Sequence, residues 1–322
     1  VHLNQAGALL HLYADGSLLL NHGGTEMGQG LFTKVAQVVA GEFDVDTARV
    51  RVSATDTARV PNTSATAASS GSDLNGMAAR EACLALKARL AAFLAPEWGV
   101  PAEAIAWRDG AAHARVDGVP RSIDLAALAR RAYMARVSLS AQGFYRTPEI
   151  HWDAAAFRGR PFYYFAYGAA VAEVAIDTLT GEHRMLGVDI LHDVGASLNP
   201  AIDLGQIEGG FVQGAGWLTS EELVHDARGR LATHAPSTYK IPTAGDVPMR
   251  WRIALLADSP NRSPTIHRSK AVGEPPLMLG LSVYHALRDA IASLAPAGAR
   301  VALTAPATPE AVLRAVRAAR VR

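Results

Sequence analysis

Apolar and polar residues alternate along the start of the chain in a pattern that predicts a β-hairpin. The apolar segments 8–13 and 17–21 flank Asp15-Gly16, and Asp-Gly between two apolar runs is typical of a tight turn. A glycine-rich segment, 22–30, comes next. It leads into an expected helix whose apolar face is formed by Leu31, Val35, Val38 and Val39.

The next elements are a short strand, a segment of small residues and a long helix. Residues 50–53 alternate as a strand, and residues 62–72 are almost all Ser, Thr, Ala, Asn and Gly. That segment has the composition of a linker, but an Ala/Leu-rich helix is predicted directly after it, over 78–94. We therefore interpret it as a loop that feeds a helix.

The second half repeats the order of the first. Residues 148–161 are irregular and favour a boundary, and the aromatic run 162–167 predicts a buried strand. A hairpin over 169–176 and 183–190 follows, then a small-residue loop and a helix that carries Gln206.

This repeated order predicts an α+β fold with two related lobes of mixed or antiparallel sheet and packed helices. The expected lobes are 1–150 and 151–322. The second lobe ends with a helix predicted from about Leu277 to Leu294, whose first turn suits Pro275 and Pro276.

Composition excludes several classes of protein. The chain has 322 residues, and its 49% hydrophobic and 19% charged residues are typical of a globular protein. Lys+Arg number 31 and Asp+Glu 30, which argues against a nucleic-acid or membrane-surface binder. The chain begins with Val1 rather than Met and runs at once into a strand pattern, so we expect it to start inside a larger polypeptide.

The single cysteine, Cys83, narrows the chemistry further. Alone it makes no intrachain disulfide, Cys-ligated zinc site or iron–sulfur cluster, and we place it in a helix core. A reducing, cytoplasmic location is the default for such a chain. The histidines are scattered without metal-ligand spacing, so no protein-ligated metal site is predicted. A metal held by an organic cofactor would leave no such pattern.

Four loops that precede or open helices are candidate binding segments: 22–30, 62–72, 197–206 and 269–276. Helix starts expose backbone N–H groups and the positive end of the helix dipole, which suits a ligand with phosphate or other oxyanion groups. The amides of Gln29 and Gln206 can donate and accept hydrogen bonds. The alternative is that small residues at these junctions only permit close packing.

Glu274 is the strongest single candidate for a catalytic residue. At a helix entrance its ionised form is favoured by the helix dipole, while its apolar neighbours should partly desolvate it. Such opposed effects suit a general base. An ordinary helix-capping glutamate explains the same local sequence equally well.

Seven segments together resemble the molybdenum-cofactor portion of xanthine dehydrogenases, a branch of the molybdenum hydroxylase family. The likeness is greatest to the C-terminal half of the large subunit of bacterial members. The segments are GGTEMGQG (23–30), TAAS (66–69), GFYRTP (143–148), LNPAID (198–203), GQIEG (205–209), PSTYKIP (236–242) and KAVGEPP (270–276).

The resemblance implies roles for individual residues. Glu274 matches the family's catalytic glutamate, which removes a proton from the hydroxyl whose oxygen attacks the substrate carbon. Ala67 and Ala68 match residues next to the substrate. The matches to cofactor-binding residues are Gly28, Gln29, Gly30, Ala68, Ser69, Ser70, Gly71 and Gln206. The pterin dithiolene, rather than any protein side chain, would hold the molybdenum.

The implied activity is hydroxylation of hypoxanthine to xanthine and of xanthine to urate with oxygen from water. Electrons would leave through 2Fe-2S clusters and FAD, carried by another chain or segment, to NAD. The implied partners are the upstream half of the molybdenum subunit and that iron–sulfur and FAD chain, in a dimer of heterodimers. Two alternatives stay open: an aldehyde or N-heterocycle hydroxylase of the same family, and a non-catalytic cofactor-binding module.

Overall fold

The chain divides into two compact units, in a computed structural model that describes residues 3–59 and 63–320. The first unit holds the chain up to Phe165 together with Asn261–Ser269, and the second holds Ala166–Pro260 and the chain from Lys270 onward. The division therefore falls at Phe165 rather than at residue 150. The return of residues 261–269 to the first unit was not expected from the sequence. Residue 62, which belongs to the predicted small-residue loop, lies outside the described residues.

The return segment belongs to the first unit because one of its side chains is buried there. Ile266 is fully buried, and a Cβ added at Gly76 would lie 3.1 Å from Ile266 Cγ1. A glycine at position 76 thus lets this segment, which includes the 3-10 helix η4 (Ile266–Arg268), lie directly on a helix of the first unit.

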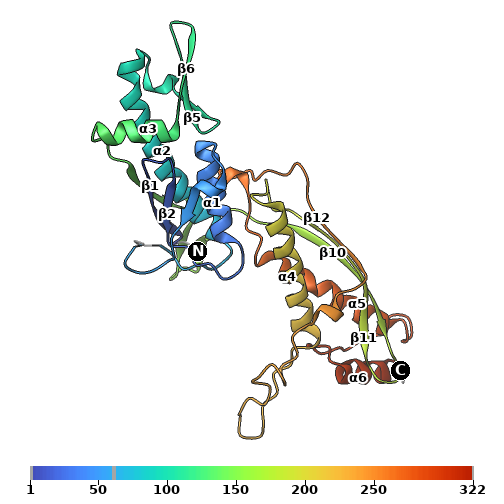
Figure 1. The fold of residues 1–322 in the computed structure, drawn as a ribbon. Coiled ribbons are helices and arrows are strands. Elements are labelled where there is room, and N and C mark those ends of the chain that lie inside the picture. Colours follow the sequence, from blue (N-terminus) through green and yellow to red (C-terminus); the bar gives the residue numbers. More distant parts are fainter. Residues whose placement is uncertain (1–2, 60–62, 321–322) are drawn as a thin grey trace. The chain divides into compact units, whose positions relative to one another are not determined.

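The first unit is built on a four-stranded sheet (Figure 1). The predicted hairpin is confirmed, with Leu10 opposite Leu20. The strands are β1 (Gln5–Leu12), β2 (Leu18–His22), β3 (Val50–Val52) and β7 (Ser140–Arg146), in the order β3-β2-β1-β7. β1 is antiparallel to β2 and β7, whereas β3 is parallel to β2.

Two helices, α1 (Leu31–Phe43) and α2 (Gly71–Trp98), supply the apolar surface that packs with this sheet in one core. Alternate residues of β1 are buried in that core, as expected for a strand with one covered face. A Cβ at Gly143 would lie 2.0 Å from the carbonyl oxygen of Ala78, so β7 and α2 approach at backbone distance. Small residues in α2 make this approach possible. Cys83 is fully buried in the same helix, as predicted.

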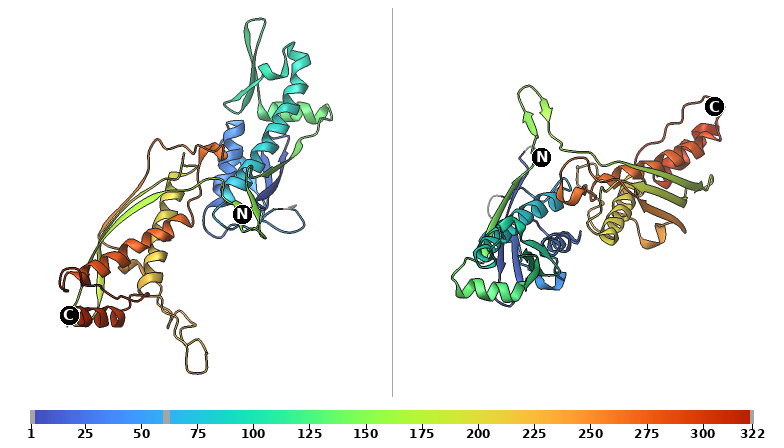
Figure 2. Two further views of the ribbon diagram at one scale, coloured as in Figure 1. Left: turned by 180° about the vertical axis from the view of Figure 1, so that it is seen from behind. Right: turned by 90° about the horizontal axis from the view of Figure 1, so that it is seen from above.

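The remaining elements of the first unit include a small sheet near the C-terminal end of α2 (Figure 2). A helix, α3 (Leu125–Met134), follows this sheet, and Asp124 caps it by accepting a hydrogen bond from the Ala127 N–H at 2.9 Å. The elements are η1 (Thr47–Arg49), η2 (Ala102–Ala104), β4 (Ala106–Arg108), β5 (Ala111–Val116), β6 (Val119–Asp124), α3 (Leu125–Met134), β8 (His151–Asp153) and β9 (Arg158–Arg160).

The second unit repeats the hairpin–helix–strand order of the first. Its antiparallel hairpin, β10 (Gly168–Ile176) and β11 (His183–His192), leads into α4 (Pro200–Thr219). The chain then returns as β12 (Arg250–Leu255), parallel to β11, just as β3 returns parallel to β2. Both units therefore contain the same ββαβ arrangement, and the α+β class predicted from the sequence is confirmed.

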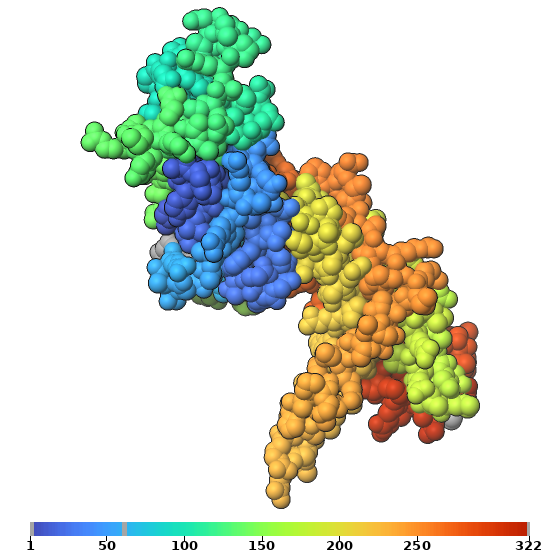
Figure 3. All heavy atoms as spheres, in the orientation of Figure 1, coloured from blue at the N-terminus to red at the C-terminus, as the bar shows by residue number. Residues whose placement is uncertain are grey.

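The C-terminal part of the second unit is helical. The predicted helix over 277–294 is a 3-10 helix, η5 (Pro275–Gly280), followed by α5 (Leu281–Ala292). The last element is α6 (Pro309–Arg320). Residues 220–249, between α4 and β12, are irregular apart from η3 (Ala244–Asp246) and project from the end of α4 (Figure 3).

The aromatic run 162–167 was predicted as a buried strand, and this was wrong. The segment is irregular, and Phe162 and Phe165 are 53% and 60% exposed. The Tyr164 hydroxyl donates instead to the buried carboxylate of Asp73 on α2, so side-chain hydrogen bonding rather than strand pairing fixes the segment. Among the described residues, no helix has both the length and the apolar character needed to cross a membrane.

Candidate cofactor and catalytic site

The glycine-rich loop between β2 and α1 is organised around the carboxylate of Glu26. This carboxylate accepts hydrogen bonds from the backbone N–H groups of Gly28 (2.9 Å), Gly30 (3.0 Å) and Phe32 (2.9 Å). Burial alone would raise the pKa of Glu26, but these donors outweigh burial and hold it below the usual value. The anion expected at this helix start is thus supplied by the protein itself.

Gln29, a predicted cofactor ligand, uses both ends of its amide within the same loop. Its Oε1 accepts from the Met27 N–H at 2.6 Å and its Nε2 donates to the Thr25 carbonyl at 2.9 Å. A ligand that bound this amide would replace one of these hydrogen bonds. A Cβ at Gly28 would meet no atom within 4 Å, so the loop backbone is open on that side.

His22, at the base of the loop, is a buried residue that the sequence analysis did not single out. Its Nδ1 accepts from the Gly24 N–H at 3.1 Å, and its ring meets the Phe32 ring edge-on. Burial lowers the pKa of His22 to about 4, so the imidazole is neutral at physiological pH. A Cβ at Gly24 would lie 2.5 Å from Leu31 Cδ2 and 2.7 Å from Asn75 Nδ2, so a side chain there would displace two buried neighbours.

The second predicted loop lies beside the first. The Thr25 N–H donates to Thr66 Oγ1 at 2.8 Å, joining the loop that carries Gln29 to the loop that carries Ala67–Gly71. Ala68 and Ser69 have φ angles of 54° and 52°, a left-handed conformation that is uncommon for residues other than glycine. Two such residues in succession mark the sort of strained turn that is concentrated at ligand-binding sites.

The helix start after this turn differs from that of α1. Ser70, the N-cap of α2, makes no capping hydrogen bond to the first turn, and its hydroxyl donates to the Ala67 carbonyl at 3.0 Å. Ala67 and Ala68 are exposed. The positive end of α2 and two small side chains therefore face outward, which suits an anionic group.

Asp73, in the first turn of α2, is a second buried group that the sequence analysis missed. Its carboxylate accepts a hydrogen bond from the Tyr164 hydroxyl. Burial raises the pKa of Asp73 to about 7, although the Tyr164 hydrogen bond and the charge of Lys34 oppose this rise. The sequence does not distinguish Asp73 from the other charged residues of this helix, such as Glu81 and Lys87.

In the second unit, Gln206 lies half-buried on α4, close to a capped helix start. Asn199 is the N-cap, and its side-chain oxygen accepts from the Ile202 N–H at 3.1 Å. The Ser197 hydroxyl donates to the buried carboxylate of Asp203 at 2.5 Å. These bonds fix the loop after β11 and the first turn of the helix that carries Gln206.

Glu274, the predicted general base, is exposed in this chain, so the expected partial desolvation is not found. Val272 and Pro276 on either side of it are buried in the second unit, which leaves the carboxylate between them on the outside. Nor does Glu274 cap the helix that follows, since its side chain makes no capping hydrogen bond to η5. The helix-capping explanation is therefore not supported.

The structure gathers the predicted residues into two groups, one in each unit. Gly28, Gln29 and Gly30 lie next to the 67–71 turn in the first unit. In the second, η5 packs on α4: a Cβ at Gly210 would lie 3.1 Å from Pro276 Cβ, and one at Gly214 only 2.1 Å from the Leu277 carbonyl oxygen. These glycines bring the segment of Glu274 onto the helix of Gln206.

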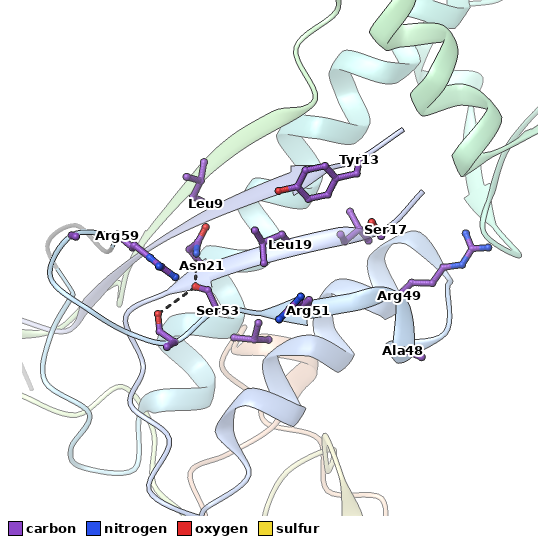
Figure 4. A pocket seen from close by; sticks show the side chains of 14 residues that line it. Leu9, Tyr13, Ser17, Leu19, Asn21, Ala48, Arg49, Arg51, Ser53 and Arg59 are labelled. Atoms are coloured by element: carbon purple, nitrogen blue, oxygen red, sulfur yellow. Dashed lines mark hydrogen bonds between the residues drawn. The ribbon is translucent and has the colours of Figure 1, made fainter. Parts of the chain in front are cut away.

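An open hollow of about 1030 Å³ lies elsewhere in the first unit and contains none of the predicted residues (Figure 4). It lies over one face of the sheet, on side chains of β1, β2 and β3, and Asn21 of β2 donates there to the hydroxyl of Ser53. Its lining residues include Leu9, Tyr13, Leu19, Arg49, Arg51 and Arg59.

The polar groups of these loops fit an organic cofactor that brings its own metal ligands. They are the amides of Gln29 and Gln206 and the backbone of the left-handed turn at Ala68 and Ser69. Within residues 3–59 and 63–320, no cluster of three His, Cys, Asp or Glu side chains is placed to ligate a metal.

Comparison with solved structures shows which class of proteins has this fold. Quinoline 2-oxidoreductase from Pseudomonas putida 86 matches with a TM-score of 0.82 and 28% identity, over 97% of this chain and 38% of that one. A CO dehydrogenase from Oligotropha carboxidovorans matches with a TM-score of 0.83 and 23% identity, over 98% of this chain and 37% of that one. The fold is thus the one found in these oxidoreductases.

Comparison of sequences then shows the family. Residues 1–248 match the model of the molybdopterin cofactor-binding domain, and the chain belongs to this family. Xanthine dehydrogenase/oxidase of Rattus norvegicus is 48% identical over 97% of this chain, and xanthine dehydrogenase of Dictyostelium discoideum is 49% identical over 90%. The chain spans 22% and 20% of these two relatives. The resemblance predicted from the seven sequence segments is confirmed.

Proposed function

We propose that this chain is part of the molybdenum catalytic unit of a xanthine dehydrogenase, which oxidises hypoxanthine to xanthine and xanthine to urate. The observation that supports this most directly is the packing of the Glu274 corner onto the helix of Gln206. It places a carboxylate and a candidate cofactor ligand on two elements of one unit. The relatives named xanthine dehydrogenase support the choice of a purine substrate.

Under this proposal, the residues that match the family's cofactor-binding positions contact the cofactor. Gln206 and Gln29 would hold it by amide hydrogen bonds. Gly28 and Gly30, whose N–H groups donate to Glu26, would let it approach the loop backbone closely, and the turn from Ala68 to Gly71 would surround the pterin. Ala67 and Ala68, with small exposed side chains, would leave space for the substrate. When bound, the molybdenum cofactor supplies the acceptor for the two electrons that leave the purine.

Glu274 would act as the general base. Its carboxylate oxygen takes the proton of a water-derived hydroxyl while the hydroxyl oxygen forms a bond to the electrophilic purine carbon. The C–H bond at that carbon breaks, and its hydrogen leaves with the electron pair. Because the carboxylate is exposed in this chain, it is accessible to a substrate and to the remaining parts of a longer protein. Burial by those parts would bring the desolvation that this chain by itself lacks.

The rest of the reaction would need partners. The upstream half of the molybdenum subunit would complete the substrate pocket. Another chain or segment would carry 2Fe-2S clusters and FAD and pass the electrons to NAD. We expect a dimer of such heterodimers in the cytoplasm.

A second candidate is hydroxylation of another N-heterocycle or of an aldehyde. The structural match to quinoline 2-oxidoreductase, at 28% identity over 97% of the chain, favours it. Initial rates with xanthine, hypoxanthine, quinoline and benzaldehyde would decide between the two candidates, because the better substrate has the higher kcat/KM.

The test of the general base is Glu274→Gln in the intact enzyme. The amide keeps the size of the side chain but accepts no proton, so we predict a loss of turnover of about 10²- to 10⁴-fold with molybdenum content unchanged. Glu222→Gln, an exposed glutamate of the same unit, is the matched control and should retain full activity. A Glu274→Gln enzyme that oxidised xanthine at a tenth of the wild-type rate would rule out the role.

A further inference from the structure

A buried ion pair lies in the second unit, close in sequence to both candidate site residues. Lys270 Nζ donates to Asp193 Oδ2 at 2.5 Å, and the two side chains are only 9% and 6% exposed. Within the described residues, the other ion pairs of this unit join side chains of which at least one is a third or more exposed.

The pair has further partners on both sides. The second carboxylate oxygen of Asp193 accepts from the Gly195 N–H at 2.9 Å, and Lys270 Nζ lies 5.2 Å from the centre of the Tyr167 ring, within cation–π range. The backbones are joined as well. The Lys270 N–H donates to the Val194 carbonyl, and the Asp193 N–H to the Tyr167 carbonyl, both at 2.8 Å.

The pair joins the two segments that matter for the proposed reaction. Asp193 directly follows β11 and begins the connection to α4, which carries Gln206. Lys270 comes four residues before Glu274, and buried Val272 lies between them. On the other side of Glu274, Pro276 and Leu277 lie against Gly210 and Gly214 of α4. The Glu274 corner is therefore fixed at both ends, by the ion pair before it and by helix packing after it.

A buried ion pair of this kind is a poor source of net stability, because desolvation of the two charges offsets their attraction. What it does provide is a fixed geometry, since both charges lose their partner if either segment moves. Fixed geometry matters most where a base must meet a reacting atom, because a displacement of about 1 Å can reduce a rate by about 10²-fold.

We propose that Lys270 and Asp193 are positioning residues that fix the Glu274 carboxylate for proton transfer. This inference rests on the proposed role of Glu274. It assigns neither residue a contact with substrate or cofactor. The consequence is that breaking the pair lowers kcat while the affinity for substrate and the cofactor content persist.

The experiment compares Lys270→Met, Lys270→Arg and the double variant Lys270→Met with Asp193→Asn, each in the intact enzyme. We expect Lys270→Met to lower kcat with xanthine by about 10- to 100-fold, with KM within about threefold and molybdenum content unchanged. Lys270→Arg keeps the charge and should recover a large part of the lost kcat. Arg314→Met, which breaks an exposed ion pair of α6 in the same unit, is the control and should leave kcat unchanged.

The double variant separates positioning from folding. It leaves no unpaired buried charge, so it keeps the protein folded even if Lys270→Met does not accumulate. Low kcat in the stable double variant supports positioning. Full kcat in that variant overturns the proposal, and so does a fall in molybdenum content that accounts for the lost activity.

Glu274→Gln distinguishes failure of this inference from failure of the proposed function. If Glu274→Gln is inactive and the double variant is fully active, only the positioning role is wrong. If Glu274→Gln is active, the proposed function is itself wrong. With both roles correct, adding Lys270→Met to Glu274→Gln lowers kcat no further, because the base that is positioned is already gone.

Discussion

At the scale of single residues, three polar side chains of the first unit have charges set by their surroundings: His22 and Asp73, which are buried, and Glu26, which is half-buried. Glu26 stays ionised because backbone N–H groups surround it, His22 stays neutral because burial excludes its charge, and Asp73 ionises only near neutral pH. All three lie in or next to the loops that carry the candidate cofactor ligands. Changes of pH should therefore act on these loops in opposite directions through His22 and Asp73.

His22 should make stability depend on pH on the acid side. Its pKa is about 4 in the folded protein against an ordinary 6.5, so the unfolded chain binds more protons and acidification from pH 6.5 to 4 costs about 3 kcal/mol. We predict that His22→Gln is less stable at pH 7 but loses less stability on acidification. Urea titrations at pH 7 and pH 5 measure this, with His11→Gln in the same sheet as control. Equal losses in wild type and His22→Gln would contradict the prediction.

Asp73 should act in the opposite sense. Its pKa is raised to about 7 from 3.8, so the folded state binds the extra proton and stability falls as pH rises from 5 to 8, by about 3 kcal/mol. Asp73→Asn removes this cost and should gain stability over wild type at pH 8 more than at pH 5. Glu81→Gln on the same helix is the control. If the difference in unfolding free energy between Asp73→Asn and wild type stayed constant with pH, the raised pKa of Asp73 would be refuted.

At the scale of elements, close approach of backbones decides where the candidate base lies. α4 contains several glycines at similar spacing, but they have different surroundings. Gly210 and Gly214 face η5, where an added Cβ would meet Pro276 or Leu277, whereas Gly205 and Gly209 have no atom within 4 Å. Glycine thus permits close packing against η5 at two positions of α4, whereas at two other positions no neighbouring atom requires it.

Two alanine variants should separate these glycines. Gly214→Ala puts a Cβ 2.1 Å from the Leu277 carbonyl, so we predict a loss of about 1–3 kcal/mol in stability and a fall in activity as η5 shifts. Gly209→Ala has space and removes a flexible residue from a helix, so it should gain about 0.5–1 kcal/mol. Thermal unfolding and xanthine oxidation measure both. Similar changes in stability and activity in the two variants would contradict the close packing of Gly214 against η5.

At the scale of the whole molecule, one ββαβ arrangement occurs twice, and each copy carries one of the two candidate glutamines. Gln29 comes directly before α1 and Gln206 lies within α4. The sequence predicted this repeat because hairpin turns, apolar periodicity and helix starts are local patterns. The boundaries of the two units depend instead on contacts between residues that are distant in sequence. Residues 261–269 return to the first unit because Ile266 is buried against α2.

Substitution of either glutamine should lower the cofactor content. We predict that Gln29→Ala and Gln206→Ala each reduce molybdenum per protein in the intact enzyme, because each removes the side-chain amide that would bind the cofactor. Gln213→Ala, an exposed glutamine farther along α4, is the control. Elemental analysis is the measurement. If neither variant lost molybdenum or turnover, the assignment of these ligands would be wrong.

The sequence by itself determined the elements and the candidate residues. Alternation, helical periodicity and turn residues are encoded within a few positions, so both hairpins, the helices α1, α2, α4 and α5 and the core position of Cys83 followed from them. The last helix, α6, was not predicted. Glu274 and Gln206 were found by the same local reasoning and by resemblance. The aromatic run 162–167 shows where local patterns fail to predict structure. Its sequence is typical of a strand, but the segment is irregular, and Tyr164 donates a hydrogen bond to Asp73, which lies 91 positions earlier in the chain.

Only the tertiary structure decided the surroundings of those residues. Neighbours that are distant in sequence, or the path of the backbone, determine that His22 and Asp73 are buried and that Glu274 is exposed. They also determine that Glu26 accepts hydrogen bonds from three backbone N–H groups. The ion pair of Asp193 and Lys270 joins residues 77 positions apart, so no local pattern predicts it. Charge, solvation and the position of a base arise from three-dimensional packing, whereas secondary structure arises largely from neighbours along the chain.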